Sequence, residues 1–271
     1  MIGFSDRVDL GKVGRLRADT TIALRVHLKE LPPEPPPRIP LYLRGTAFDS
    51  YDGRSWSRDK TQVPAPRAGE RVWLFSSGIA LGRELMTIDL EPIKPPVLFL
   101  PSGTGAFDVL SKDDKLLGRP PRITRGREGD YEYVGVEERG LRYRVYERPP
   151  GAGVEPLGGL EAARYLALPA GLPERIADLA RSWAGDARSP RRIAQRIERQ
   201  LQTQYAYDLE SPSGGAANPL DHFLFESKSG HCEFYSTAMA VLLRTQGVPT
   251  RNVTGFIGGT YNRFGGFYAV R

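Results

Sequence analysis

The spacing of the apolar residues changes once along the chain, and this change limits the folds that the sequence can adopt. Thr20 to Lys29 alternates between apolar and polar residues, and similar short stretches between Gly- and Pro-rich turns continue to about residue 150. Gly151 to Gly159 is a Gly- and Pro-rich linker, after which apolar residues recur at helical spacing. The sequence predicts an α+β protein, with an antiparallel β-sandwich-like domain over 1–150, a linker over 151–159 and a second domain over 160–271.

Local signals place strands and helices within the two predicted domains. In the first domain, strands are expected at Leu85–Leu90, Val97–Leu100, Tyr131–Glu137 and Leu141–Tyr146. In the second, an apolar stripe indicates a helix that ends at Gly185, and Ser189-Pro190 opens another helix with the serine as its cap. Asn218-Pro219 opens a third, short helix. These helices are expected to pack the domain rather than to carry chemistry.

Charge and cysteine content exclude several classes of protein. The net charge is +6, and it divides into 25 Lys and Arg against 21 Asp and Glu (net +4) over 1–150 and 13 against 11 (net +2) over 151–271. This even spread argues against a nucleic-acid partner. No apolar stretch reaches the ~18–20 residues that cross a bilayer, so the chain as given is expected to be soluble. One cysteine cannot form an intrachain disulfide.

The single cysteine, Cys232, lies where a Gly-containing loop runs into a helix. Apolar residues recur at helical spacing after it, at Tyr235, Ala238, Met239, Leu242 and Leu243, and Gly247 and Pro249 supply a helix stop. The free N–H groups and the dipole of a helix start favour a thiolate, which predicts a nucleophile with a lowered pKa. A free cysteine that only fills the core is the alternative, and spacing alone leaves the two readings at about even odds.

A resemblance favours the nucleophile. Residues 218–271 resemble the transglutaminase-like core in an ordered, gapless series of motifs: Gly230-His231-Cys232, Leu242-Leu243-Arg244, Gly247-Val248-Pro249-Thr250-Arg251 and Val253-Thr254-Gly255-Phe256. The resemblance implies a papain-like α+β core and acyl transfer, in which Cys232 attacks an amide or peptide carbonyl and passes the thioester to an amine or to water. In this family a histidine and then an aspartate follow on later strands. Phe267 to Arg271 resembles the strand just before the histidine, so this chain is expected to lack both and to be inactive.

The first domain also carries a resemblance. Gly3 to Gly11, Leu41 to Gly45, Phe48-Asp49 and Asp52 to Trp56 are similar to bacterial membrane proteins of the TgpA type. That resemblance implies transmembrane helices before and after this portion, which is then extracytoplasmic and truncated at both ends. It also implies a protein or peptide substrate, of which cell-wall peptide is one candidate. A non-catalytic module that binds or scaffolds the cell envelope is the alternative, and a histidine and an aspartate encoded further along would exclude it.

The other candidate site residues are weaker. His231 is adjacent to Cys232, and neighbouring side chains diverge, so it is a poor general base and is expected to pack in the loop or line the cleft. Tyr205 and Tyr207 are expected to donate a hydrogen bond to an oxyanion or wall the cleft, with packing as an equal alternative. The backbone N–H of Cys232 is the natural oxyanion donor. Glu233 complements the helix dipole but opposes a thiolate, and the sequence does not decide which effect dominates.

No cofactor or metal site is predicted. The chain has three histidines, His27, His222 and His231, which are scattered, and with one cysteine they do not form a zinc site. His27 falls on the polar face of its strand, and His222 is expected at the surface or in a cap. The acidic residues show no ligand spacing.

Overall fold

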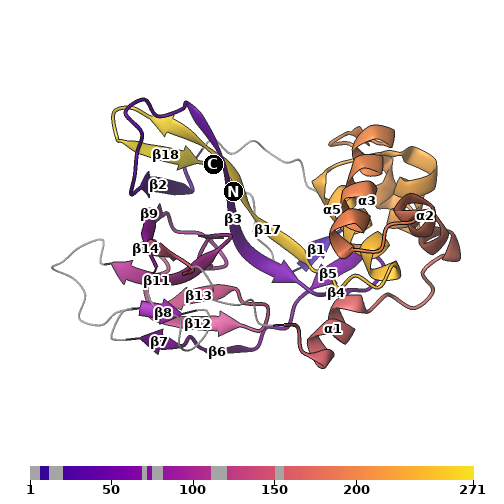
Figure 1. Cartoon of the computed structure of the whole chain (residues 1–271), viewed down its shortest axis with the longest axis horizontal. Coiled ribbons are helices and arrows are strands. Elements are labelled where there is room, and N and C mark those ends of the chain that lie inside the picture. The colour runs from indigo at the N-terminus through magenta and orange to yellow at the C-terminus, as the bar shows by residue number, and fades with distance from the viewer. Residues whose placement is uncertain (1–6, 12–20, 69–71, 75–81, 111–120, 150–155) are drawn as a thin grey trace.

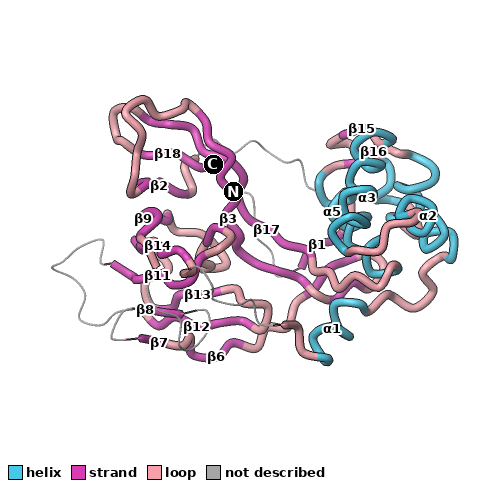
Figure 2. The backbone as a smooth tube through the Cα atoms, viewed as in Figure 1, coloured by secondary structure: helices cyan, strands magenta, loops and turns pink. Residues whose placement is uncertain are grey.

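The structure is a computed structural model that describes residues 7–11, 21–68, 72–74, 82–110, 121–149 and 156–271. Strands fill one end of the molecule and helices the other (Figures 1 and 2). Two long strands, β3 (Arg38–Phe48) and β17 (Asn252–Asn262), pair with each other and run from the strand-rich end to the helical end. Continuous backbone pairing therefore joins the two ends.

A ten-stranded antiparallel sheet forms most of the strand-rich end. Its order is β10 (Leu100–Pro101), β3, β17, β18 (Phe267–Val270), β2 (Leu24–Leu28), β9 (Glu84–Leu90), β14 (Leu141–Glu147), β11 (Thr104–Leu110), β8 (Val72–Leu74) and β7 (Arg67–Ala68). A three-stranded sheet of β13 (Tyr131–Val134), β12 (Arg122–Gly126) and β6 (Gln62–Pro64) shares its hydrophobic core. The predicted fold class, an antiparallel β region followed by a transglutaminase-like α+β core, is confirmed.

Two of the predicted strands are shorter in the structure. Val97 forms only an isolated bridge, and the strand begins at Leu100 as β10. Pro95 and Pro96 precede this segment and have no N–H to donate to a ladder. β13 ends at Val134 because Gly135 adopts a left-handed φ of 106°, which turns the chain out of the sheet.

The C-terminal hairpin lies inside the N-terminal sheet. β17 pairs with β3 along one side, and β18 pairs with β2, so residues 252–270 separate two strands that precede residue 50. The sequence predicted strands after the helix but gave no indication of their partners. The division of the chain at 151–159 remains a prediction.

The helical end also takes residues from both predicted domains. Its core contains Phe48, Tyr51 and Trp56, which are buried together with residues of the helices. These aromatic residues come from a small sheet of β1 (Arg7–Asp9), β5 (Ser55–Ser57) and β4 (Ser50–Tyr51) and from the end of β3. The Trp56 indole donates a 2.9 Å hydrogen bond to Thr237 Oγ1 in the last long helix. The small sheet therefore supports the helices directly.

The helices follow the local signals closely. They are α1 (Gly159–Leu166), α2 (Glu174–Ala184), α3 (Pro190–Gln204), α4 (Pro219–His222), which continues as a π-turn over Phe223–Ser227, and α5 (Cys232–Thr245); a 3₁₀ turn covers Pro212–Gly215. Ser189 caps α3 with Pro190 in its first turn, and α2 ends at Gly185 in a left-handed conformation. Within the described part of the chain, no helix is long and apolar enough to span a membrane.

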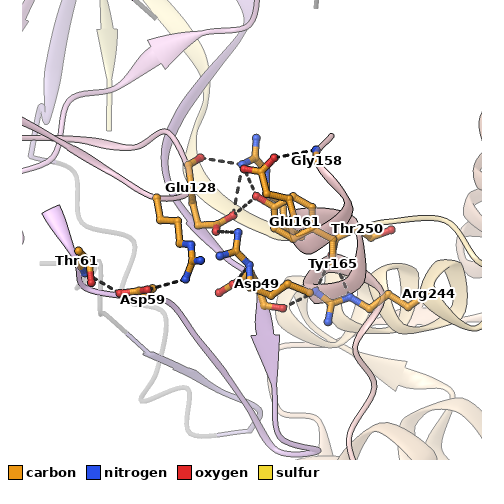
Figure 3. A network of polar contacts seen from close by, with 12 residues as sticks. Asp49, Asp59, Thr61, Glu128, Gly158, Glu161, Tyr165, Arg244 and Thr250 are labelled. Carbon is orange, nitrogen blue, oxygen red and sulfur yellow. Dashed lines mark hydrogen bonds and ion pairs between the residues drawn. The ribbon is translucent and has the colours of Figure 1, made fainter. Parts of the chain in front are cut away.

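A buried carboxylate, Glu128, ties the strand-rich end to the helical end (Figure 3). It lies in the turn between β12 and β13 and is 1% exposed. Arg164 donates to its Oε1 at 2.8 Å and the Tyr165 hydroxyl to its Oε2 at 2.6 Å, both from α1. Arg251, just before β17, donates to its carbonyl oxygen at 2.8 Å, and Arg44 of β3 donates to the same carbonyl. We call Glu128 and these four partners the Glu128 cluster.

Candidate functional site

Cys232 is the first residue of α5, as the sequence predicted, and it is exposed. His231 is the N-cap, with extended backbone that sets the direction of the helix. A short parallel pair of strands, β15 (Ala206–Tyr207) and β16 (Ser229–Gly230), holds the preceding loop and places Tyr207 opposite Gly230. The thiol therefore lies at the surface, beside a tyrosine that comes from the end of α3.

The electrostatic setting of the thiol differs from the prediction. The pKa of Cys232 is raised. The larger cause is desolvation of the thiol by the surrounding protein atoms, and the second cause is the nearby charge of Glu233. Hydrogen bonds from backbone N–H groups and from Tyr207 act in the opposite direction but are weaker. The helix start was expected to lower the thiol pKa, but the pKa is raised, because desolvation and the charge of Glu233 outweigh the backbone N–H groups at the helix start.

Tyr207 is the tyrosine that reaches the thiol. Its side chain is 63% exposed, and the interaction of its hydroxyl with Cys232 lowers the pKa of the thiol. Its ring centroid lies 6.3 Å from that of Tyr235, one turn into α5. This arrangement sets a phenolic O–H beside the sulfur and beside the N–H of the first helical residue.

Tyr205, the other tyrosine considered from sequence, does not line the site. It is buried between Trp183 and Phe223, and its hydroxyl donates a 2.8 Å hydrogen bond to the Leu224 carbonyl. Burial raises its pKa to about 12. Tyr205 is the C-cap residue of α3 and packs into the core with that helix, whereas Tyr207 belongs to β15 and is largely exposed.

His231 packs in the loop and is not placed as a general base. It is 2% exposed, and its ring meets Phe234 edge-on at 5.0 Å. Burial lowers its pKa, so the neutral imidazole is favoured. Its Nδ1 lies 3.9 Å from Glu233 Oε2, and within the described part of the chain neither atom has a hydrogen-bond partner.

Glu233 has an environment that the sequence did not reveal. Desolvation and, to a smaller extent, the charge of Asp9 together raise its pKa to about 7. Asp9 belongs to β1, more than 200 positions away, so no local signal predicts this proximity. The ordinary cue of a glutamate in a first helical turn suggested only a favourable interaction with the dipole.

The remaining histidines lie outside the site. His222 Nδ1 is 3.0 Å from Ser213 Oγ, and its Nε2 is 3.4 Å from Glu226. Ser213 is fully buried, so this arrangement is part of the loop structure. His27 Nε2 is 3.0 Å from Asp89 Oδ2 across the pair of β2 and β9. Among the described residues, no group of three or more His, Cys, Asp or Glu side chains is arranged to hold a metal.

β17 meets α5 at its first residue, Asn252. The Asn252 side chain donates a 3.2 Å hydrogen bond to Ser236, one turn beyond Cys232 in α5. β18 pairs with β17 only over 260–262, and among the described strands none pairs with that side of β17 over 252–259.

Comparison with known protein families agrees with these observations. Residues 1–150 match the TgpA N-terminal domain, and residues 177–270 match the transglutaminase-like superfamily. A protein-glutamine gamma-glutamyltransferase of Pseudomonas aeruginosa is 29% identical over 271 residues, which cover 99% of this chain and 37% of that protein. An uncharacterized protein of Bacillus subtilis, YebA, is 36% identical over 114 residues, covering 40% of this chain and 16% of that protein. The chain thus spans little more than a third of the longer match.

Solved structures match the whole chain. The crystal structure of the periplasmic domain of TgpA from Pseudomonas aeruginosa superposes with a TM-score of 0.75 at 25% identity, over 100% of this chain and 86% of that one. The same domain bound to ethylmercury gives a TM-score of 0.74 over 99% of this chain and 88% of that one, again at 25% identity. Because residues 1–150, more than half of the chain, match the TgpA N-terminal domain and residues 177–270 match the transglutaminase-like superfamily, the chain belongs to the TgpA family of transglutaminase-like proteins.

Proposed function

We propose that this chain is the extracytoplasmic part of an acyl-transfer enzyme with Cys232 as its nucleophile. The observation that carries the proposal is an exposed thiol on the first residue of α5, within a segment that matches the transglutaminase-like superfamily. The similarity to a protein-glutamine gamma-glutamyltransferase supports a protein substrate with carboxamide side chains. The similarity to a periplasmic domain supports a location outside the cytoplasm.

The proposed reaction has two steps. In the first, the sulfur bonds to the carboxamide carbon, the carbon–nitrogen bond breaks, and ammonia leaves with the thiol proton. In the second, an amine attacks the thioester, an amide bond forms, and the thiol regains its proton. Water in place of the amine gives a deamidated side chain, and a peptide carbonyl in place of the carboxamide gives cleavage.

The groups beside the thiol suit an oxyanion. The backbone N–H of Cys232 at the helix start and the Tyr207 hydroxyl both lie next to the sulfur, where the carbonyl oxygen would gain charge. Removing one oxyanion donor of this kind typically lowers kcat by ~10²–10³-fold. Tyr207 is therefore proposed as the side-chain donor, and His231 as part of the loop that shapes the site.

The general base is proposed to lie beyond Arg271. Neither His231, which is buried and neutral, nor His222, which is engaged with Ser213, is placed to take the thiol proton. A strand following β18 along the unpaired side of β17 would bring its side chains to α5. This geometry supports a catalytic histidine there, and an aspartate further on, so the chain of 271 residues is proposed to be inactive alone. Membrane attachment of the longer protein is likewise proposed from its family.

A labelling assay tests this proposal. The longer natural protein and the 271-residue chain are each mixed with a fluorescent primary amine and a glutamine-rich protein, and incorporation is followed on gels. We expect incorporation by the longer protein, its loss on Cys232→Ala, and none by the 271-residue chain. Activity of the short chain would overturn the proposed position of the base.

A second readout separates the nucleophile from a binding module. Organomercurials bind thiolates, and the Pseudomonas relative has been crystallised with ethylmercury. We expect the folded chain to bind one equivalent of ethylmercury at Cys232 and the Cys232→Ala variant to bind none. If the longer protein keeps full activity with Cys232→Ala, Cys232 is not the nucleophile; if it shows no activity while binding envelope peptides, the non-catalytic module is correct.

A further inference from the structure

The carboxyl group of Glu233 is an uncommon feature of the first turn of α5. Its Oε2 is buried without a hydrogen-bond partner in the described part of the chain, whereas most buried carboxylate oxygens are paired. The polar atom beside it, His231 Nδ1 at 3.9 Å, is also buried and unpartnered. Among the described residues, no lysine or arginine forms an ion pair with Glu233, so these residues provide no fixed counter-charge for the carboxyl group.

Among the described residues, the charge that shifts the pKa of Glu233 is that of Asp9, and it favours the neutral form. Asp9, from β1, is an anion held in place by Arg7 at 2.7 Å and by Ser55. His231, from the loop before α5, is neutral because it is buried. Cys232, from α5 itself, carries no charge until its thiol loses a proton.

We propose that Glu233 is a positioning residue that controls how readily Cys232 ionises, because its neutral form permits the thiolate and its charged form opposes it. This inference rests on the proposed role of Cys232, but it concerns a group that touches no substrate. Cys232 and Glu233 are the first two residues of α5 and share its first turn, and the charge of Glu233 raises the pKa of Cys232.

The two groups therefore titrate against each other. Glu233 loses its proton near pH 7, and from that point its charge makes loss of the thiol proton harder. The thiolate fraction then rises with pH less steeply than it does for an isolated thiol. For a thiol without such a neighbour, the alkylation rate rises tenfold with each unit of pH, as long as the pH is below the pKa of the thiol.

Alkylation of the folded 271-residue chain by iodoacetamide, measured from about pH 5.5 to 9.5, tests the coupling. In the wild type we expect the logarithm of the rate to flatten around the pH at which Glu233 ionises. In Glu233→Gln we expect a single slope and about three- to tenfold faster alkylation just above neutral pH. Glu233→Asp keeps the charge and should keep the flattening. Glu198→Gln, an exposed carboxylate on α3, is the matched control and should leave the profile unchanged.

A second variant distinguishes coupling from a structural effect. Asp9→Asn removes the charge that opposes ionisation of Glu233, so the flattened region should move to lower pH. A carboxyl ¹³C NMR titration of Glu233 in the wild type reports the same event directly. Identical alkylation profiles for wild type and Glu233→Gln, or a Glu233 carboxyl that titrates in the ordinary range near pH 4.5, would overturn the proposal. Alkylation measures the thiol alone, so this result is independent of whether acyl transfer is observed.

Discussion

Two carboxylates of this molecule, the buried Glu128 and the partly buried Glu233, have opposite surroundings. Glu128 is held by Arg164 and Tyr165 through its carboxyl group and lies near Arg251, so its charge is compensated on several sides (Figure 3). Glu233 faces another carboxylate and a neutral histidine, and one of its oxygens has no hydrogen-bond partner among the described residues. The comparison shows that a compensated carboxylate fixes the fold, whereas an uncompensated one remains free to change its protonation near neutral pH.

Removing the charge of Glu128 should have the largest effect. Glu128→Gln leaves Arg164 and Arg251 beside an amide in a buried site, and breaking a buried ion pair of this kind costs about 3–5 kcal/mol of unfolding free energy. Chemical denaturation measures this loss. A loss below about 1 kcal/mol, typical of surface pairs, would show that the cluster is not a joint between the two ends.

Removing the charge of Glu233 should change stability in a pH-dependent way. The folded-state pKa is raised from 4.5 to about 7, so ionisation disfavours the folded state, and stability is lost as pH rises between these values. We expect Glu233→Gln to remove this decline and to be more stable than the wild type above pH 7, by up to about 3 kcal/mol. Denaturation curves at about pH 5 and pH 8 measure the difference. Equal pH dependence in both proteins would contradict the comparison.

Removing a tyrosine hydroxyl, at Tyr165 or at Tyr207, should change the free energy of unfolding less than removing either carboxylate charge. Tyr165 is buried and donates to Glu128, so Tyr165→Phe leaves a buried acceptor without one partner and should cost about 1–3 kcal/mol of unfolding free energy. Thermal or chemical denaturation measures this. If Tyr165→Phe is neutral, arginine alone is sufficient to satisfy the Glu128 carboxyl group.

Tyr207→Phe should have the smallest effect on stability, within about 0.5 kcal/mol, because Tyr207 is largely exposed. Its hydroxyl lowers the pKa of Cys232, so the variant should instead alkylate more slowly at a fixed pH below that pKa. Rates of iodoacetamide labelling test this. Unchanged labelling would mean that the hydroxyl does not hydrogen-bond the thiol in solution.

Local features of the fold could be predicted from the sequence, and long-range ones could not. The cap at Ser189, the stop at Gly185 and the start of α5 at Cys232 depend on residues within one turn of each other, and the structure agrees with them. The insertion of β17 between β3 and β18 depends on pairing across about 200 residues, for which a single sequence carries no register signal.

The candidate site divides in the same way. The position of Cys232 at a helix start follows from glycine, cysteine and an apolar stripe, and the transglutaminase-like resemblance added family and reaction class. The thiol pKa was predicted in the wrong direction because desolvation depends on tertiary packing that periodicity does not report. The proximity of Asp9 to Glu233 arises from the small sheet of β1, β5 and β4, whose place beside the helices is also a tertiary feature.

The position of β17 and β18 in the sheet has a consequence for synthesis. When the first 150 residues have been made, β3 and β2 have no strand between them, and the sheet stays in two parts until residues 252–270 arrive. Contacts of such large sequence separation form late and slowly. A truncated translation product ending before β17 therefore lacks both a whole sheet and the Asn252 contact to the helix that carries Cys232.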